Sequence, residues 1–149
     1  MRIILLVLVV LSQAACNPSD RRPGLWLTGT QTKFAGDWTF TDDYREIAVQ
    51  VSTPYLVPHS VTIWSGSLDG TLYIGASAPE TKRWPGWVDA NPQVTLKIGE
   101  LLYQVQLKPL EEESLIGEVQ GAFASKYELP ERSPQYEGQT SRYWRVQSM

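Results

Sequence analysis

The sequence has very few of the residues that form covalent links and metal sites. Its 149 residues include one cysteine, Cys16, and one histidine, His59. A single cysteine excludes an internal disulfide, so burial alone must stabilise the fold. One histidine with one cysteine also rules out the usual structural zinc sets, which take four such ligands. We therefore expect no metal cofactor.

Long apolar runs are missing as well. The run from Ile3 to Leu11 has nine residues, which is too few to span a bilayer as a helix. The charge of Arg2, this apolar run and the small residues that follow have the layout of a secretory signal peptide. We predict an exported chain with a signal peptide at 1–16, a polar flexible tether at 17–24 and one domain at 25–149.

The position of Cys16 resembles the lipobox of bacterial lipoproteins, which Ala14 and Ala15 fit. The resemblance implies that Cys16 is lipidated and attaches the mature protein to a membrane of the cell envelope. In a Gram-negative host this would be the outer membrane or the periplasmic face of the inner one. The other interpretation is ordinary cleavage near residues 12–14, which would leave an unpaired thiol in an exported chain.

Neither sign of charge dominates the chain. Thirteen lysines and arginines stand against 16 aspartates and glutamates, for a net charge of -3. The cations are scattered along the sequence, so nothing in it indicates nucleic-acid binding.

Alternation of apolar and polar residues, the pattern of half-buried strands, recurs in short segments. These segments lie at 47–51, 61–64, 71–76, 94–98 and 102–107, and a last β-rich run lies at 143–146. Asp69-Gly70 separates the second segment from the third, and Gly99-Glu100 separates the fourth from the fifth. These dipeptides predict two β-hairpins.

Helical spacing begins after the third carboxylate of Glu111-Glu112-Glu113 and continues to Phe123. We expect a helix near 111–126, because carboxylates favour the positive end of a helix, and we prefer this to a metal site. A short irregular or helical piece is expected at 81–91. The order of elements favours a mainly β fold, a single small antiparallel barrel with one or two helices packed on it.

The stretch from Gly70 to Leu96 resembles the core of the FMN-binding split-barrel superfamily, the fold of pyridoxamine 5'-phosphate oxidase-like proteins and deazaflavin-dependent nitroreductases. The successive segments are LYIGAS, APETKR, WPGWVDA and NPQVTL. The resemblance implies a split β-barrel that binds FMN at the interface of a homodimer. It also implies two-electron transfer between the flavin and a small-molecule substrate.

The same resemblance implies which residues contact the cofactor. A flavin phosphate needs cations and backbone amides, and arginine matches its oxygens well. By its position before Asn91-Pro92, Arg83 matches the family's phosphate-contacting arginine. Trp84 stands where the family commonly has a lysine, and Lys82 lies just before. We take Lys82, Arg83 and Trp84 as candidate cofactor-binding residues.

Three ring-bearing side chains have two interpretations each. Trp84 and Trp87 either close the barrel as core residues, or at least one of them stacks on a flat ligand ring. His59 precedes the first predicted hairpin and is either structural or a further cofactor-binding candidate.

A second resemblance leads to a different barrel. The segment from Phe34 to Trp38 resembles the Gly-x-Trp start of lipocalins, which are common among bacterial lipoproteins. Two function classes therefore stay open. One is a flavin-dependent oxidoreductase anchored in the envelope. The other is a non-catalytic ligand-binding or structural lipoprotein, built on a degenerate split barrel or a lipocalin-like barrel.

Overall fold

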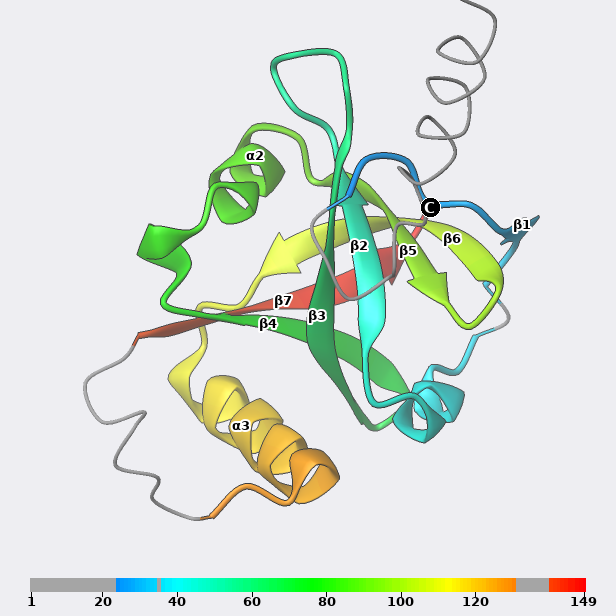
Figure 1. Cartoon of the computed structure of the whole chain (residues 1–149). Coiled ribbons are helices and arrows are strands. Elements are labelled where there is room, and N and C mark those ends of the chain that lie inside the picture. Colours follow the sequence, from blue (N-terminus) through cyan, green and yellow to red (C-terminus); the bar gives the residue numbers. More distant parts are fainter. Residues whose placement is uncertain (1–23, 35, 131–139) are drawn as a thin grey trace, which may run out of the picture.

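Six antiparallel strands form a closed β-barrel (Figure 1). The structure is a computed structural model that describes residues 24–34, 36–130 and 140–149. The strands run in the order β6-β5-β2-β3-β4-β7, and a pairing between β6 and β7 closes the barrel. Their bounds are β2 Ile47–Val51, β3 His59–Leu68, β4 Thr71–Ser77, β5 Gln93–Ile98, β6 Leu101–Pro109 and β7 Ser141–Ser148. A short strand, β1 (Thr30–Thr32), adds parallel to the first part of β6.

Within the described residues, two α-helices and two 3-10 turns connect the strands. Helix α2 (Trp84–Ala90) follows the turn η2 (Pro79–Thr81) between β4 and β5, and α3 (Glu113–Tyr127) lies between β6 and β7. A further turn, η1 (Thr39–Asp43), precedes β2. Figure 1 shows α2 and α3 well separated, on either side of β4 and β7.

The predicted fold class is confirmed. Both hairpins form where the turn dipeptides stand, and Asp69 and Gly70 have φ of 50° and 73°, as a type I′ turn requires. The helices at 81–91 and 111–126 are confirmed with narrower or shifted bounds. The lipocalin-like alternative does not hold, because lipocalin barrels have eight strands and this one has six. Trp38 of that motif instead packs in the barrel core.

Alternation along the strands builds the barrel interior. Val49, Leu72, Leu96 and Trp144 are all fully buried and belong to one core cluster. Intervening residues such as Tyr73 face outward, and there α3 covers them with a second cluster. The strands thus contribute to two apolar layers, one inside the barrel and one beneath α3.

The close packing of α3 on the barrel depends on two glycines. A Cβ added at Gly66 would lie 2.9 Å from the Phe123 ring. A Cβ at Gly75 would lie 2.9 Å from the Tyr143 ring and 3.3 Å from that of Phe123. Because these positions of β3 and β4 carry no side chain, the aromatic rings of α3 and β7 come close to the sheet.

The predicted signal peptide and most of the predicted tether precede Gly24, the first residue that the structure describes. The signal peptide at 1–16, with Cys16, and the tether up to residue 23 lie outside the described residues. Gly24, the last residue of the predicted tether, bridges to Ser60 at the start of β3. Within the ranges that the structure covers, no helix is long and apolar enough to cross a membrane.

Candidate functional site

The chain between β4 and β5 forms the region where the sequence places the candidate site. Ala78 has a left-handed φ of 45° and turns the chain into η2. Helix α2 then begins at Trp84, with Pro85 in its first turn, and ends at Ala90. The amide of the following residue, Asn91, donates to the Trp87 carbonyl at 2.9 Å. The Asn91 side chain accepts a bond from the Gln93 amide, which starts β5. Asn91-Pro92 therefore ends helix α2 and leads directly into strand β5.

The two tryptophans of α2 have different surroundings. Trp84 is 4% exposed and packs on Trp144, with ring centroids 5.0 Å apart. Trp87 is half-buried, and its ring meets His59 at 5.2 Å and Tyr55 at 6.2 Å, both edge to face. Trp84 is therefore part of the core, whereas Trp87 keeps part of its ring at the surface, between α2 and the β2–β3 loop.

The two cations before α2 are exposed and differ in their contacts. The Lys82 ammonium donates to the backbone carbonyl of Ser77. The Arg83 side chain makes no hydrogen bond or ion pair with any residue in the described ranges. Arg83 occupies the N-cap position with helical φ and ψ, so it lies one turn before Trp87 on the same helical face. The Arg83 guanidinium, which has no partner among the described residues, is thus close along the helix to the half-exposed Trp87 indole.

His59 joins this region from β3. Burial lowers the pKa of its imidazole below the ordinary value, so the ring is neutral at pH 7. Its contact with Trp87 brings a residue of the β2–β3 connection against α2. The structure therefore places Lys82, Arg83, Trp84 and His59 at or around α2, and their role in cofactor binding stays a prediction.

An ion pair that no sequence pattern predicted holds the outer side of α2. Both Arg142 amino groups donate to the Asp89 carboxylate, at 2.8 and 2.6 Å. These bonds lower the pKa of Asp89. The guanidinium also lies over the Trp144 ring, 4.9 Å from its centre. Because 53 residues separate the partners, no local pattern could have revealed the pair.

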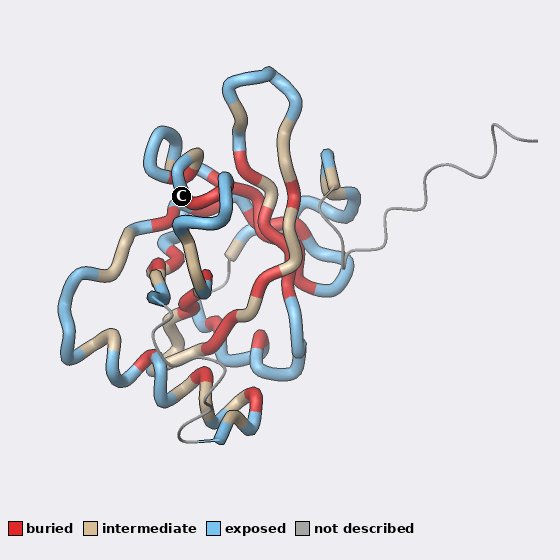
Figure 2. Tube along the Cα trace, turned by 60° about the vertical axis from the view of Figure 1, so that its left-hand side comes forward, coloured by how far each residue is buried: buried red, intermediate tan, exposed pale blue. Residues whose placement is uncertain are grey.

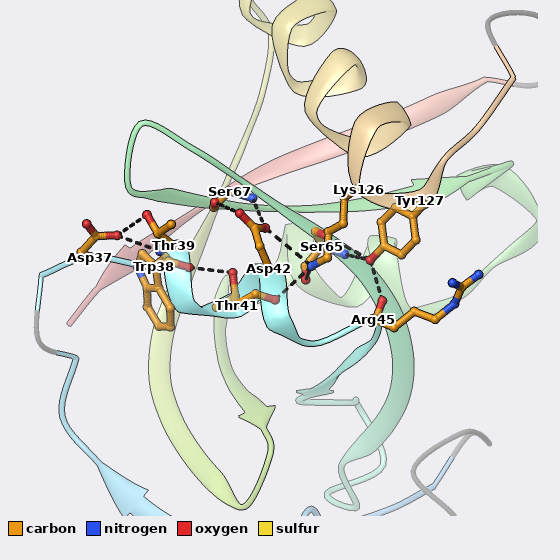
Figure 3. Close-up of polar contacts among 10 residues, drawn as sticks. All are labelled: Asp37, Trp38, Thr39, Thr41, Asp42, Arg45, Ser65, Ser67, Lys126 and Tyr127. Atoms are coloured by element: carbon orange, nitrogen blue, oxygen red, sulfur yellow. Dashed lines mark hydrogen bonds and ion pairs between the residues drawn. The ribbon is translucent and has the colours of Figure 1, made fainter.

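A second concentration of polar groups lies where α3 ends (Figure 3). The Lys126 ammonium donates to the Thr41 carbonyl at 3.0 Å and lies 3.8 Å from an Asp42 oxygen. The Tyr127 hydroxyl accepts from the Ser65 amide at 2.9 Å and donates to the Arg45 carbonyl at 2.7 Å. Burial lowers the pKa of Lys126 and raises that of Tyr127.

These groups at the end of α3 are engaged with one another and with the backbone. Asp42 also accepts from the Ser67 amide at 3.2 Å and from the Ser67 hydroxyl, which ties η1 to β3. The cluster therefore joins α3, η1 and β3 and offers little to a ligand. In the part of the chain that the structure covers, no group of three or more metal-ligating side chains could hold a metal ion.

Comparison with known proteins shows that this chain is similar in fold to several solved structures. No protein-family model and no curated protein matches the chain. A conserved hypothetical protein from Mycobacterium tuberculosis is 14% identical, with a TM-score of 0.57 over 78% of this chain and 85% of the other. An FAD-binding protein from Mesorhizobium loti is 13% identical, with a TM-score of 0.54 over 74% of this chain and 82% of the other. A candidate pyridoxamine 5'-phosphate oxidase from Listeria innocua is 14% identical, with a TM-score of 0.50 over 71% and 85%.

The chain has a split-barrel fold. The six-stranded barrel is shared with pyridoxamine 5'-phosphate oxidase-like and flavin-binding proteins, as the resemblance in sequence predicted. Identities this low carry the fold alone, because one fold serves many functions and a function must be argued from the site.

Proposed function

We propose that this protein is exported, lipid-anchored in the cell envelope through Cys16, and binds a flavin nucleotide beside α2. The observation that carries the flavin proposal is the pairing of Arg83 with Trp87. Among the described residues the Arg83 guanidinium has no hydrogen-bond or ion-pair partner, and it stands one helical turn from the half-exposed Trp87 indole. That pair suits a ligand with a phosphate at one end and a flat ring at the other.

The residues present fit FMN in part. Arg83 would hold the phosphate, and Lys82 would assist it by leaving the Ser77 carbonyl. Trp87, with His59 and Tyr55 at its edges, would contact the ring system. Trp84 does not fit a stacking role, since its ring is already packed on Trp144. Pro85 lacks an amide hydrogen, so the helix start presents one donor fewer to a phosphate.

When bound, the flavin supplies two-electron transfer to or from a small substrate. The chain's own residues then have the task of binding and orienting it. The neutral His59 ring packs against the Trp87 ring and limits the positions that Trp87 takes. By the resemblance, two copies of the chain would form a homodimer with the flavin at their interface.

A specific observation also favours a second candidate, a non-catalytic envelope protein that keeps the barrel without the flavin. The burial of Trp84 and the presence of Pro85 remove two contacts that a flavin nucleotide would gain from α2. In that case Trp87 and the loop beside it would serve a different small ligand or a structural contact.

Titration of FMN into the purified protein, followed by flavin fluorescence, tests the proposal. Arg83→Ala should weaken FMN binding about 10- to 150-fold, as expected for one charge-assisted phosphate contact. Riboflavin lacks the phosphate, so its affinity should stay the same in this variant. Arg45→Ala is the matched control, because this exposed side chain extends away from the polar cluster at the end of α3 (Figure 3). If neither FMN nor reduced deazaflavin binds at millimolar concentration, the flavin proposal is wrong.

The anchor has its own test. In cells, Cys16→Ala should release the protein from the membrane fraction, and the mass of the mature chain should lose the acyl groups. An unchanged mass and location would contradict lipidation and leave the flavin proposal untouched.

A further inference from the structure

An uncharged apolar surface lies near the first described residue. We name five of its residues, Leu25, Trp26, Tyr55, Leu56 and Val57, the apolar tip. All five are exposed, and Leu56 is 95% exposed. The last three belong to the β2–β3 loop, which projects from the barrel and is pale blue at its end in Figure 2. The barrel core uses none of these five side chains, and the flavin proposal uses only Tyr55, at the edge of the Trp87 ring.

Hydrogen bonds join the two parts of the apolar tip. Gly24 and Ser60 exchange backbone hydrogen bonds of 2.7 and 2.9 Å, and the Ser60 hydroxyl donates to the Leu25 carbonyl. Leu25 and Trp26 are therefore held beside the base of the loop that carries Tyr55, Leu56 and Val57. In Figure 1 the first described segment, drawn in blue, runs past the base of the β2–β3 loop.

The conformation of the loop turns Leu56 outward. The Thr53 hydroxyl donates to the Val57 carbonyl at 2.7 Å and accepts from the Tyr55 amide at 3.1 Å. Between them Leu56 has a φ of 66°, in the left-handed region that leucine rarely adopts. An exposed leucine in an unfavourable backbone conformation is an outlier from which a functional role can be hypothesised, because such strain clusters at functional sites.

The chemistry of the apolar tip suits the surface of a lipid bilayer. Tryptophan and tyrosine favour the membrane–water interface, and leucine and valine favour the hydrocarbon beneath it. Residues 24–29 and 52–58 contain no charged side chain, so anionic headgroups would not repel either segment. A second copy of the chain is a poorer match, since a standard protein interface uses about 20–30 residues a side.

The length of the chain before Gly24 brings the apolar tip within reach of a membrane. Gly24 lies eight positions after Cys16, and a fully extended chain of that length spans at most about 29 Å. We propose that the apolar tip docks into the bilayer interface, with Leu56 inserted and Trp26 and Tyr55 at headgroup level. Only the distance between Cys16 and the apolar tip depends on the proposed lipid anchor. The exposure of the five side chains, the Leu56 backbone conformation and the uncharged composition of both segments do not depend on it.

Photocrosslinking in cells tests this docking with the full chain. A diazirine analogue of leucine replaces Leu56 with almost no change of shape, so folding is preserved. The matched control places the same analogue at Leu101, an exposed leucine at the start of β6 in the β5–β6 hairpin. After irradiation, mass spectrometry reads both the adducts and the state of Cys16 in the same sample.

The proposal expects phospholipid adducts at position 56 and several-fold fewer at position 101. Phospholipid adducts at 56 on a chain with unmodified Cys16 would support docking and contradict the anchor. A lipidated Cys16 with no lipid adduct at 56, or with equal adducts at both positions, would overturn docking and leave the anchor standing. Adducts from position 56 to a second copy of the chain would also overturn it, because the tip would then be a protein interface.

Discussion

The two helices of this barrel are held in different ways. Helix α3 ends in buried hydrogen bonds, in which Lys126 and Tyr127 satisfy backbone groups of η1 and β3. Helix α2 packs on the core through Trp84 and Val88, and the pair Asp89–Arg142 joins it to β7 at the surface. At α3 the polar groups are used within the fold. At α2 a guanidinium and a half-exposed indole are left at the surface.

Charged and aromatic residues serve different purposes at the end of α3 and at the start of α2. Lysine, tyrosine and aspartate at the end of α3 carry perturbed or paired charges, which in isolation would suggest a functional site. Their hydrogen bonds to groups of η1, β3 and Arg45 show that they join elements of the fold. Arg83 has no such partner among the described residues, and this makes α2 the better candidate for ligand binding.

The largest expected effect separates the two tryptophans of α2. Trp84→Ala should lower the free energy of unfolding by about 3–5 kcal/mol, because a buried ring leaves a cavity against Trp144. Trp87→Ala should cost about 1–2 kcal/mol, since part of its ring is already in water. Urea denaturation of both variants measures the difference. Equal losses would show that Trp87 is core and would remove the ring contact from the flavin proposal.

The next effect tests whether the polar cluster at the end of α3 is structural. Tyr127→Phe removes the hydroxyl that accepts from the buried Ser65 amide, so we expect a loss of about 1–3 kcal/mol. Tyr55→Phe is the matched control at an exposed tyrosine and should change stability by about 0.5 kcal/mol or less. Neither variant should bind FMN more weakly than the unchanged protein. If a stably folded Tyr127→Phe variant bound FMN more weakly, the ligand would lie near α3, and our assignment of FMN to α2 would be wrong.

A smaller effect is expected at Leu56. Its left-handed conformation costs about 1–2 kcal/mol, and glycine would relieve this while losing about 0.5–1 kcal/mol of backbone entropy. Leu56→Gly should therefore raise the free energy of unfolding by up to about 1 kcal/mol. Leu101→Gly, at the start of β6, should lower it by about 0.5–1 kcal/mol instead. Destabilisation by both changes to a similar extent would mean that the loop conformation carries no strain.

The smallest expected effect is the pH dependence from His59. Burial lowers its pKa in the folded chain, so below the ordinary value of 6.5 the unfolded chain binds more protons. Stability should therefore fall as pH drops from 7 through this window. The aromatic side chains of Trp87 and Tyr55, which surround this region, carry no charge there. In the His59→Gln variant this decrease in the free energy of unfolding should be absent. If the variant and the unchanged protein had the same pH profile, the imidazole would be as well solvated in the folded chain as in the unfolded one.

The barrel could be predicted from sequence because its strands are marked locally. Asp69-Gly70 adopts the turn that its composition favours, and Asn91-Pro92 ends α2 and starts β5 as its chemistry requires. The strand β1 and the turn η1 were missed. β1 is three residues long and pairs with β6, about 70 residues away, so no short-range pattern marks it.

The candidate site was predictable only in part. The positions of Lys82 and Arg83 before α2 followed from the order of motifs along the chain. The sequence could not decide which of Trp84 and Trp87 is buried, because that depends on Trp144, at the far end of the chain. The Asp89–Arg142 pair and the exposure of Leu56 depend on tertiary packing and loop geometry in the same way.

Hydrogen exchange of the purified protein with and without FMN tests the difference between the two helices most directly. We predict that FMN slows amide exchange in the β2–β3 loop near His59 and across residues 82–90. Exchange at η1 and α3 should stay as it is without the ligand. Slowing confined to η1 and α3, or no slowing anywhere at saturating FMN, would contradict the assignment of ligand binding to α2.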